Sequence, residues 1–97
     1  MKFDQFQIST TDGRHVRHGI VGEHWAIEIQ SIQSLAHGAR TAVTDLASGH
    51  KSEPVRLTPI DAVLLIQRLD ARGPASTTDA ALNADVVEML RPFFEAP

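Results

Sequence analysis

The feature that most constrains this fold is the segment 57–73, which carries the signals of a helix at both ends. Thr58 is a good N-cap because its hydroxyl can accept a backbone N–H of the first turn. Pro59 then occupies the first helical position, where a missing N–H costs little. Gly73 suits the left-handed position that follows a helix. The sequence therefore predicts a central helix over residues 58–72.

Apolar residues recur along this helix with a spacing of three and four, which places them on one face. Ala62, Val63, Leu65, Ile66 and Leu69 form the stripe, and Ile60 and Leu64 widen it. A stripe this wide must pack against something broad, and a β-sheet is its natural partner. Alternatively, part of the stripe is a partner-binding face.

The chain before the helix alternates between apolar and polar residues, as half-buried strands do. A hairpin turn is expected at Thr11-Asp12-Gly13, because Asp-Gly supplies the backbone angles of tight turns. The third strand could continue to Leu35, because a bulge would restore the apolar face where Ile32 breaks the alternation. The expected strands cover Lys2–Thr10, Arg14–Val21, His24–Gln30, Ala39–Leu46 and, as a short edge piece, Pro54–Leu57.

A second helix is expected near the end of the chain, over residues 78–91. It should stop near Leu90, because a residue that precedes proline disfavours helical geometry and Pro92 follows shortly after. Phe93 and Phe94 are expected to fold back onto the body of the protein. Left exposed, the aromatic pair would instead be a candidate contact site.

These elements predict an α+β protein with one domain spanning residues 1–97. An antiparallel meander of four or five strands fills residues 1–57, and the two helices pack on one of its faces. The expected core joins the strand residues Phe6, Ile8, Val16, Ile20, Trp25, Ile27, Ile29 and Val43 to the helix residues Val63, Leu65, Ile66 and Leu69.

Composition narrows the function classes. The chain of 97 residues contains no cysteine, which excludes disulfides and thiolate metal sites. Its net charge of −3 does not resemble the basic footprint of a nucleic-acid-binding protein. The first residues show no apolar signal core and no apolar run is long enough to span a bilayer, so a cytoplasmic protein without membrane contact is expected.

No set of residues resembles an active site. No serine lies in an activating motif, and no glycine-rich loop precedes a helix. His15 and His18 are three residues apart, so a regular strand places them on opposite faces, where they cannot chelate one ion. No enzyme, cofactor or metal site is therefore expected, and a His-based metal or small-ligand protein is kept as a further alternative.

One local basic cluster, residues 14–18, supports an alternative hypothesis of nucleic-acid association. On a strand it could follow a phosphate backbone, although the cluster contains none of the aromatic residues that stack on bases in sheet-based RNA-binding proteins. Two arginines from later strands could join it across the sheet. The candidate binding residues of the chain are Arg14, His15, Arg17, His18, Arg40, Arg56, Phe93 and Phe94.

The leading hypothesis, reached by elimination, is a non-catalytic protein–protein interaction module. Small inhibitors, adaptors and immunity-type proteins of a bacterium or mobile element fit this description. The expected partner is another protein, bound through the sheet surface, a sheet edge or the acidic helical end. A homodimer through a sheet edge or through the Phe93–Phe94 pair is a further expectation.

Overall fold

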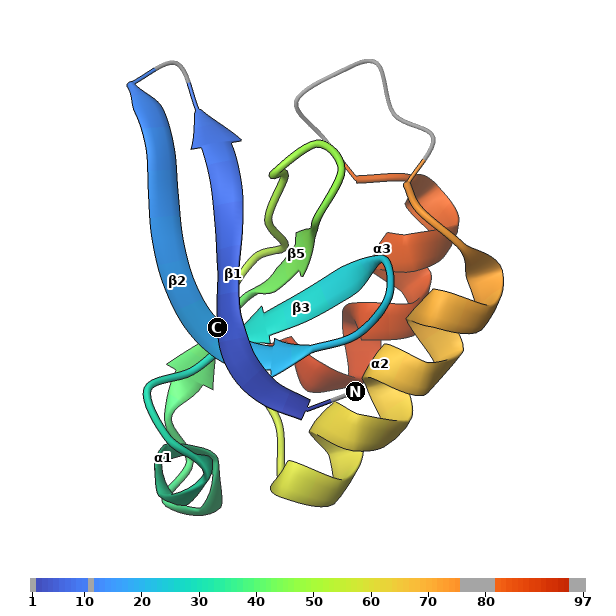
Figure 1. Cartoon of the computed structure of the whole chain (residues 1–97). Coiled ribbons are helices and arrows are strands. Elements are labelled where there is room, and N and C mark those ends of the chain that lie inside the picture. Colours follow the sequence, from blue (N-terminus) through green and yellow to red (C-terminus); the bar gives the residue numbers. More distant parts are fainter. Residues whose placement is uncertain (1, 11, 76–81, 95–97) are drawn as a thin grey trace.

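The computed structural model describes residues 2–10, 12–75 and 82–94 and confirms the α+β class (Figure 1). An antiparallel sheet has the strand order β1-β2-β3-β5, and β4 pairs with β6 in a second, two-stranded sheet. In chain order the elements are β1 (Lys2–Thr10), β2 (Gly13–Val21), β3 (Trp25–Glu28), α1 (Ile32–Ala36), β4 (Arg40–Thr41), β5 (Val43–Asp45), β6 (Val55–Arg56), α2 (Pro59–Arg72), α3 (Ala84–Leu90) and the 3-10 helix η1 (Arg91–Phe93).

The β1–β2 hairpin is the longest pair in the sheet. It is paired from Lys2 opposite Val21 to Thr10 opposite Gly13, so the two strands meet where the hairpin turn was expected; Thr11 of that turn lies outside the described residues. Because β3 pairs with β2 only over its last three residues, the distal half of the hairpin projects beyond the rest of the sheet (Figure 1). The prediction of Val16 as a core residue is wrong: Val16 lies in this projecting half and is 50% exposed.

The hairpin register assigns Phe6 and Ile8 of β1 to the face away from α2. Phe6 lies directly opposite Arg17, and side chains of directly opposed residues share a face. Ile20 is an odd number of residues from Arg17 and therefore points to the other face. The expectation that Phe6 packs against the helix is thus wrong. Phe6 and Ile8 instead form a small second core with Ala26, bordered by Val21 and Leu46.

Helix α2 has the ends that the sequence predicts. The Thr58 hydroxyl accepts the backbone N–H of Asp61 at 3.1 Å, and Gly73 follows the helix with a φ of 99°. Its buried residues Ala62, Leu65, Ile66 and Leu69 join Ile20, Trp25, Ile27, Ile29 and Val43 in the main core. The prediction of Val63 as a core residue is wrong, because Val63 lies toward the solvent side of the helix and is 38% exposed.

The middle of the chain departs from the predicted meander at two points. The extension of the third strand to Leu35 is wrong: Ser31 caps the short helix α1, and its hydroxyl accepts the backbone N–H of Ser34 at 3.3 Å. The predicted strand 39–46 is divided at Ala42, because β4 turns to pair with β6 while β5 stays with β3. Because of these two departures, the main sheet next to β2 is shorter than the sequence predicts.

The C-terminal helix is shorter than the predicted 78–91. It begins at Ala84, and the predicted start at residues 78–81 lies outside the described part of the chain. It ends at Leu90 as expected, and Pro92 lies in the 3-10 turn that follows. Phe93 and Phe94 fold back against the main core, where Phe94 forms a β-bridge with Val55.

Candidate functional site

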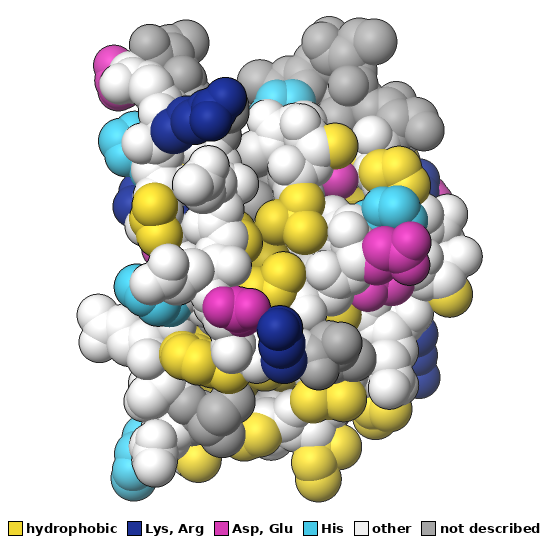
Figure 2. Space-filling model, viewed as in Figure 1, with side chains coloured by type: hydrophobic (Ala, Val, Ile, Leu, Met, Phe, Trp, Pro, Cys, Tyr) yellow, Lys and Arg dark blue, Asp and Glu magenta, His cyan; other side chains and the backbone are white. Residues whose placement is uncertain are grey.

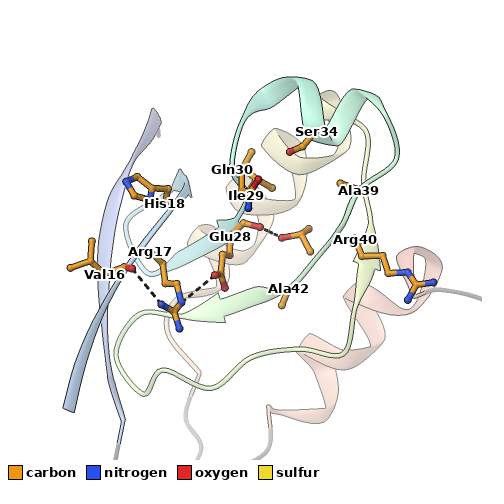
Figure 3. A pocket seen from close by; sticks show the side chains of 11 residues that line it. Val16, Arg17, His18, Glu28, Ile29, Gln30, Ser34, Ala39, Arg40 and Ala42 are labelled. Atoms are coloured by element: carbon orange, nitrogen blue, oxygen red, sulfur yellow. Dashed lines mark hydrogen bonds and ion pairs between the residues drawn. The ribbon is translucent and has the colours of Figure 1, made fainter. Parts of the chain in front are cut away.

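An open groove of about 580 Å³ lies beside β2, on the side where β3 ends (Figure 3). One wall is the β2 strand itself, and the other is formed by α1 and the start of β4. We call this space the β2 groove. Its lining residues are Val16, Arg17, His18, Glu28, Ile29, Gln30, Ser34, Ala39, Arg40, Thr41 and Ala42.

The wall formed by β2 is an open strand edge at residues 14–17, which no described strand covers on the groove side. The carbonyl of His18 accepts the backbone N–H of Ile29 at 3.0 Å, so even-numbered residues of β2 direct their backbone groups toward the β3 side. Arg14 and Val16 therefore direct theirs toward the same side, past the end of β3. Within the described residues, positions 14–17 pair only with β1.

The open edge is only lightly protected. Arg17 Nη1 lies 3.5 Å from the carbonyl oxygen of Val16, at the long limit of a hydrogen bond. On the outer edge of the hairpin, by comparison, the carboxylate of Asp4 accepts the backbone N–H of Gln5 at a shorter 2.8 Å. Native proteins cover or charge long strand edges because these edges pair readily with other chains.

Glu28 organises the charge of the groove. Its carboxylate lies 3.2 Å from Arg17 Nε and 3.4 Å from Lys51 Nζ, and Figure 3 shows the Arg17 and Glu28 side chains pointing toward each other. The Thr41 hydroxyl also donates to the Glu28 backbone carbonyl. Two cations thus share one carboxylate, and of these two cations Arg17 lines the groove.

The predicted basic cluster is divided between separate places. Arg17 faces Glu28, whereas Arg40 and Arg56 lie directly opposite each other in the β4–β6 pair. Figure 3 shows the Arg40 side chain pointing away from Arg17. Arg14 is exposed in the projecting half of the hairpin. The structure therefore does not gather the four arginines on one strand face.

The remaining predicted residues also lie apart. His15 is opposite Ile8 and His18 is opposite Gln5, which places the two histidines on different faces, as alternation requires. The Nε2 atoms of His18 and Gln5 are 3.3 Å apart. Phe93 and Phe94 are half-buried against the core, far from forming a fully exposed aromatic pair.

The structure exposes an apolar surface on α2 that the sequence analysis assigned to the core. Pro59, Ile60, Val63 and Leu64 line a shallow apolar depression of about 290 Å³. Ile60 is 72% and Leu64 46% exposed. Hydrophobic side chains gather at the lower end of the molecule in Figure 2, where α2 begins in Figure 1. The width of the stripe could have indicated this exposed surface, because one helix cannot bury residues all round its axis against one sheet.

The last turn of α2 is attached to the strands by polar contacts. Asp70 accepts the backbone N–H groups of Glu23 and His24 at 2.8 and 2.9 Å. Trp25 Nε1 donates to the Gly73 carbonyl at 2.9 Å. A Cβ on Gly22 would collide with the Asp70 carboxylate, so only glycine fits there. These contacts are structural and hold the helix against the sheet.

Arg72 extends this attachment to α3. Its Nη2 atom donates to Asp85 Oδ1 at 2.9 Å, and its Nε atom donates to the other carboxylate oxygen. The hydrogen bond from Arg72 holds the pKa of Asp85 below its usual range. The ion pair therefore joins the ends of two helices that the sequence separates by a long connection.

Within residues 2–10, 12–75 and 82–94, no three His, Cys, Asp or Glu side chains are grouped so that they could hold a metal ion. Among the described helices, none combines the length and apolar character needed to cross a membrane. No protein-family model, no curated protein and no solved structure matches this chain. Among the described residues, the β2 groove and the apolar surface of α2 are the two surfaces whose chemistry suggests binding.

Proposed function

We propose that this chain is a non-catalytic protein-interaction module that binds an extended segment of a partner protein along β2. The open strand edge at residues 14–17 supports the proposal most, because its Val16 and Arg17 line an open groove of about 580 Å³. Strand addition to an exposed sheet edge is a common way of recognising peptides, in which main-chain hydrogen bonds supply affinity. Small inhibitors, adaptors and immunity-type proteins are the kinds of protein that would use such a site.

The side chains of β2 suggest what the partner segment contains. An added strand alternates its side chains between the two faces, as β2 does. On one face its neighbour is Val16, which is apolar and exposed, and on the other it is Arg17. The best fit is a short extended segment that alternates apolar residues with aspartate or glutamate.

The backbone N–H of Val16 provides a direct test. A Val16→Pro variant removes this donor from the open edge, where proline is tolerated because the N–H does not serve the β1–β2 pairing. Val16→Thr is the matched control, since it keeps the N–H and the strand preference. Both variants and the wild type are used to capture proteins from nuclease-treated lysate of the native host, and folding is checked by circular dichroism.

A captured protein that Val16→Thr retains and Val16→Pro loses supports strand addition. Amide chemical shifts then locate the contact: partner binding should perturb the Arg14 and Val16 signals more than those of His15 and Arg17. Equal capture by both variants, or shifts confined to another surface, contradicts the proposal. Should Val16→Pro fail to fold, the Arg14→Glu/Arg17→Glu double variant tests the charge requirement instead.

Nucleic-acid association is the second candidate, because Arg40 and Arg56 lie side by side in the β4–β6 pair. Here Arg40→Glu/Arg56→Glu should abolish binding to a mixed-sequence oligonucleotide and flatten its salt dependence. If this variant still binds nucleic acid, binding through Arg40 and Arg56 is excluded. Captured proteins that remain bound after nuclease treatment favour the first proposal. For the His-based metal alternative, the described residues contain no group of three or more possible ligands.

A further inference from the structure

The solvent face of α2 combines an apolar stripe with two opposite charges at a defined spacing. Ile60, Val63 and Leu64 are exposed on this face, which lies opposite the buried residues of the helix. Asp61 and Arg68 flank the stripe on one side, close together around the helix axis. No ion pair involving either side chain is found within the described residues.

The positions of the two charges are self-complementary. Asp61 and Arg68 are seven residues apart, which is about 10.5 Å along a helix, and Leu64 lies near the midpoint. When a second α2 packs antiparallel across a two-fold axis at Leu64, the flanking side of one helix meets the same side of the other. Asp61 of each copy then lies level with Arg68 of the other copy, and the two Leu64 side chains meet at the axis.

We infer that this face of α2 binds a second copy of the same chain in an antiparallel, two-fold symmetric helix pair. An interface of this kind is self-complementary, as two-fold symmetry requires. Other registers are less favourable: a two-fold axis nearer Ile60 would bring the two Asp61 carboxylates together. The inference is independent of the β2 groove, which lies on a different part of the surface.

The size of the apolar stripe sets the strength of the dimer. A handful of side chains on one helix covers much less than the roughly 800 Å² per partner of a standard stable interface. We therefore expect a reversible dimer that dissociates on dilution, with a dissociation constant in the micromolar range or weaker. High salt should weaken it further, because the two ion pairs are exposed to solvent.

Sedimentation velocity over a concentration series from micromolar to millimolar tests this inference on the whole chain. The wild type should shift from monomer to dimer, and Leu64→Glu should stay monomeric. Arg68→Asp and Asp61→Arg should each weaken self-association about tenfold, because each change turns two attractive pairs into repulsive ones. Arg91→Asp, at the start of η1, carries the same charge change as Arg68→Asp and should leave self-association unchanged.

The double variant Asp61→Arg/Arg68→Asp makes the test specific for the antiparallel register. Exchanging the two charges restores both pairs, so this variant should dimerise about as well as the wild type. Circular dichroism confirms that each variant folds, which is expected because the substituted positions are partly or largely exposed. A wild type that remains monomeric throughout, a Leu64→Glu variant that still dimerises, or a double variant that fails to recover would each overturn the inference.

Discussion

Asp70 illustrates how one side chain joins distant parts of this chain. Each of its two oxygens accepts a different backbone N–H. The donors are Glu23 and His24, which lie 47 and 46 positions earlier in the chain. Hydrogen bonds to an ionised group contribute more to stability than those between neutral groups. Nothing in the sequence around Asp70 distinguishes it from the other polar residues of α2, so its role was not predictable.

Replacing Asp70 should reveal this role in two steps. Asp70→Ala removes the charged acceptor of two hydrogen bonds, so the free energy of unfolding should fall by about 2 kcal/mol or more. Asp70→Asn keeps a single acceptor oxygen and should lose about half as much. Urea denaturation at neutral pH measures both values. Equal losses in the two variants would mean that the carboxylate charge, rather than the two hydrogen bonds, stabilises the contact.

The Arg72–Asp85 pair should make stability depend on pH. Because Arg72 lowers the pKa of folded Asp85, the pair contributes fully above the unfolded-state value near 3.9 and is lost as pH falls through the lower folded-state pKa. Wild type should therefore be more stable than Asp85→Asn at pH 7, and the difference should shrink progressively below about pH 4. Thermal unfolding across this range checks the trend; a difference that is constant with pH contradicts it.

At the scale of elements, strong local signals made α2 predictable and weak ones made the middle of the chain unpredictable. The cap, the proline, the periodic apolar residues and the terminal glycine all lie between Thr58 and Gly73, and they agree with one another. Helix α1 has only five residues, too few for helical periodicity to show. The division at Ala42 depends on pairing with β6, more than ten residues later, which no local pattern records.

The β1–β2 register explains why the prediction that Phe6 packs against α2 was wrong. Alternation correctly grouped Phe6 with Ile8 and Val16 with Ile20, but it cannot say which groups share a face of the sheet. That choice was made by the pairing of Phe6 with Arg17. The same gap affected the candidate site: the arginines were identified by residue type, yet their division between two sheets follows from pairing alone.

The N-cap of α2 allows the local argument to be tested. Thr58 is exposed, so Thr58→Ala removes the hydrogen bond to the Asp61 N–H without disturbing the core. The free energy of unfolding should fall by about 1 kcal/mol. Thr58→Ser, which keeps the hydroxyl acceptor, should stay close to the wild type in the same denaturation experiment. A serine variant as unstable as the alanine variant would show that the threonine methyl group matters instead.

At the scale of the whole molecule, one core joins the sheet to both longer helices. Trp25 is fully buried in this core and contacts the end of α2 through its indole N–H. The smaller cluster around Phe6 lies on the opposite face of the sheet and shares strands with the main core. The two clusters are therefore connected through the same hydrogen-bonded strands.

This arrangement predicts a single cooperative unfolding transition. Trp25 is the only tryptophan of the chain, so its fluorescence reports on the main core, while far-UV circular dichroism reports on all helices and strands. The two signals should have coincident midpoints in a urea titration. A fluorescence midpoint at lower urea would show that the α2 contacts open before the sheet does.

The contacts at the end of α2 also have a kinetic consequence. They close loops of 46 to 48 residues, whereas the β1–β2 hairpin closes through a tight turn. Contacts between residues far apart in sequence form late in folding, because the loop entropy must be lost before they are gained. We therefore expect substitutions at Asp70 to accelerate unfolding with little effect on the refolding rate, and substitutions in the hairpin turn to slow refolding. The lifetime of the native state would then be set by the attachment of α2, even though the hairpin determines how fast that state is reached.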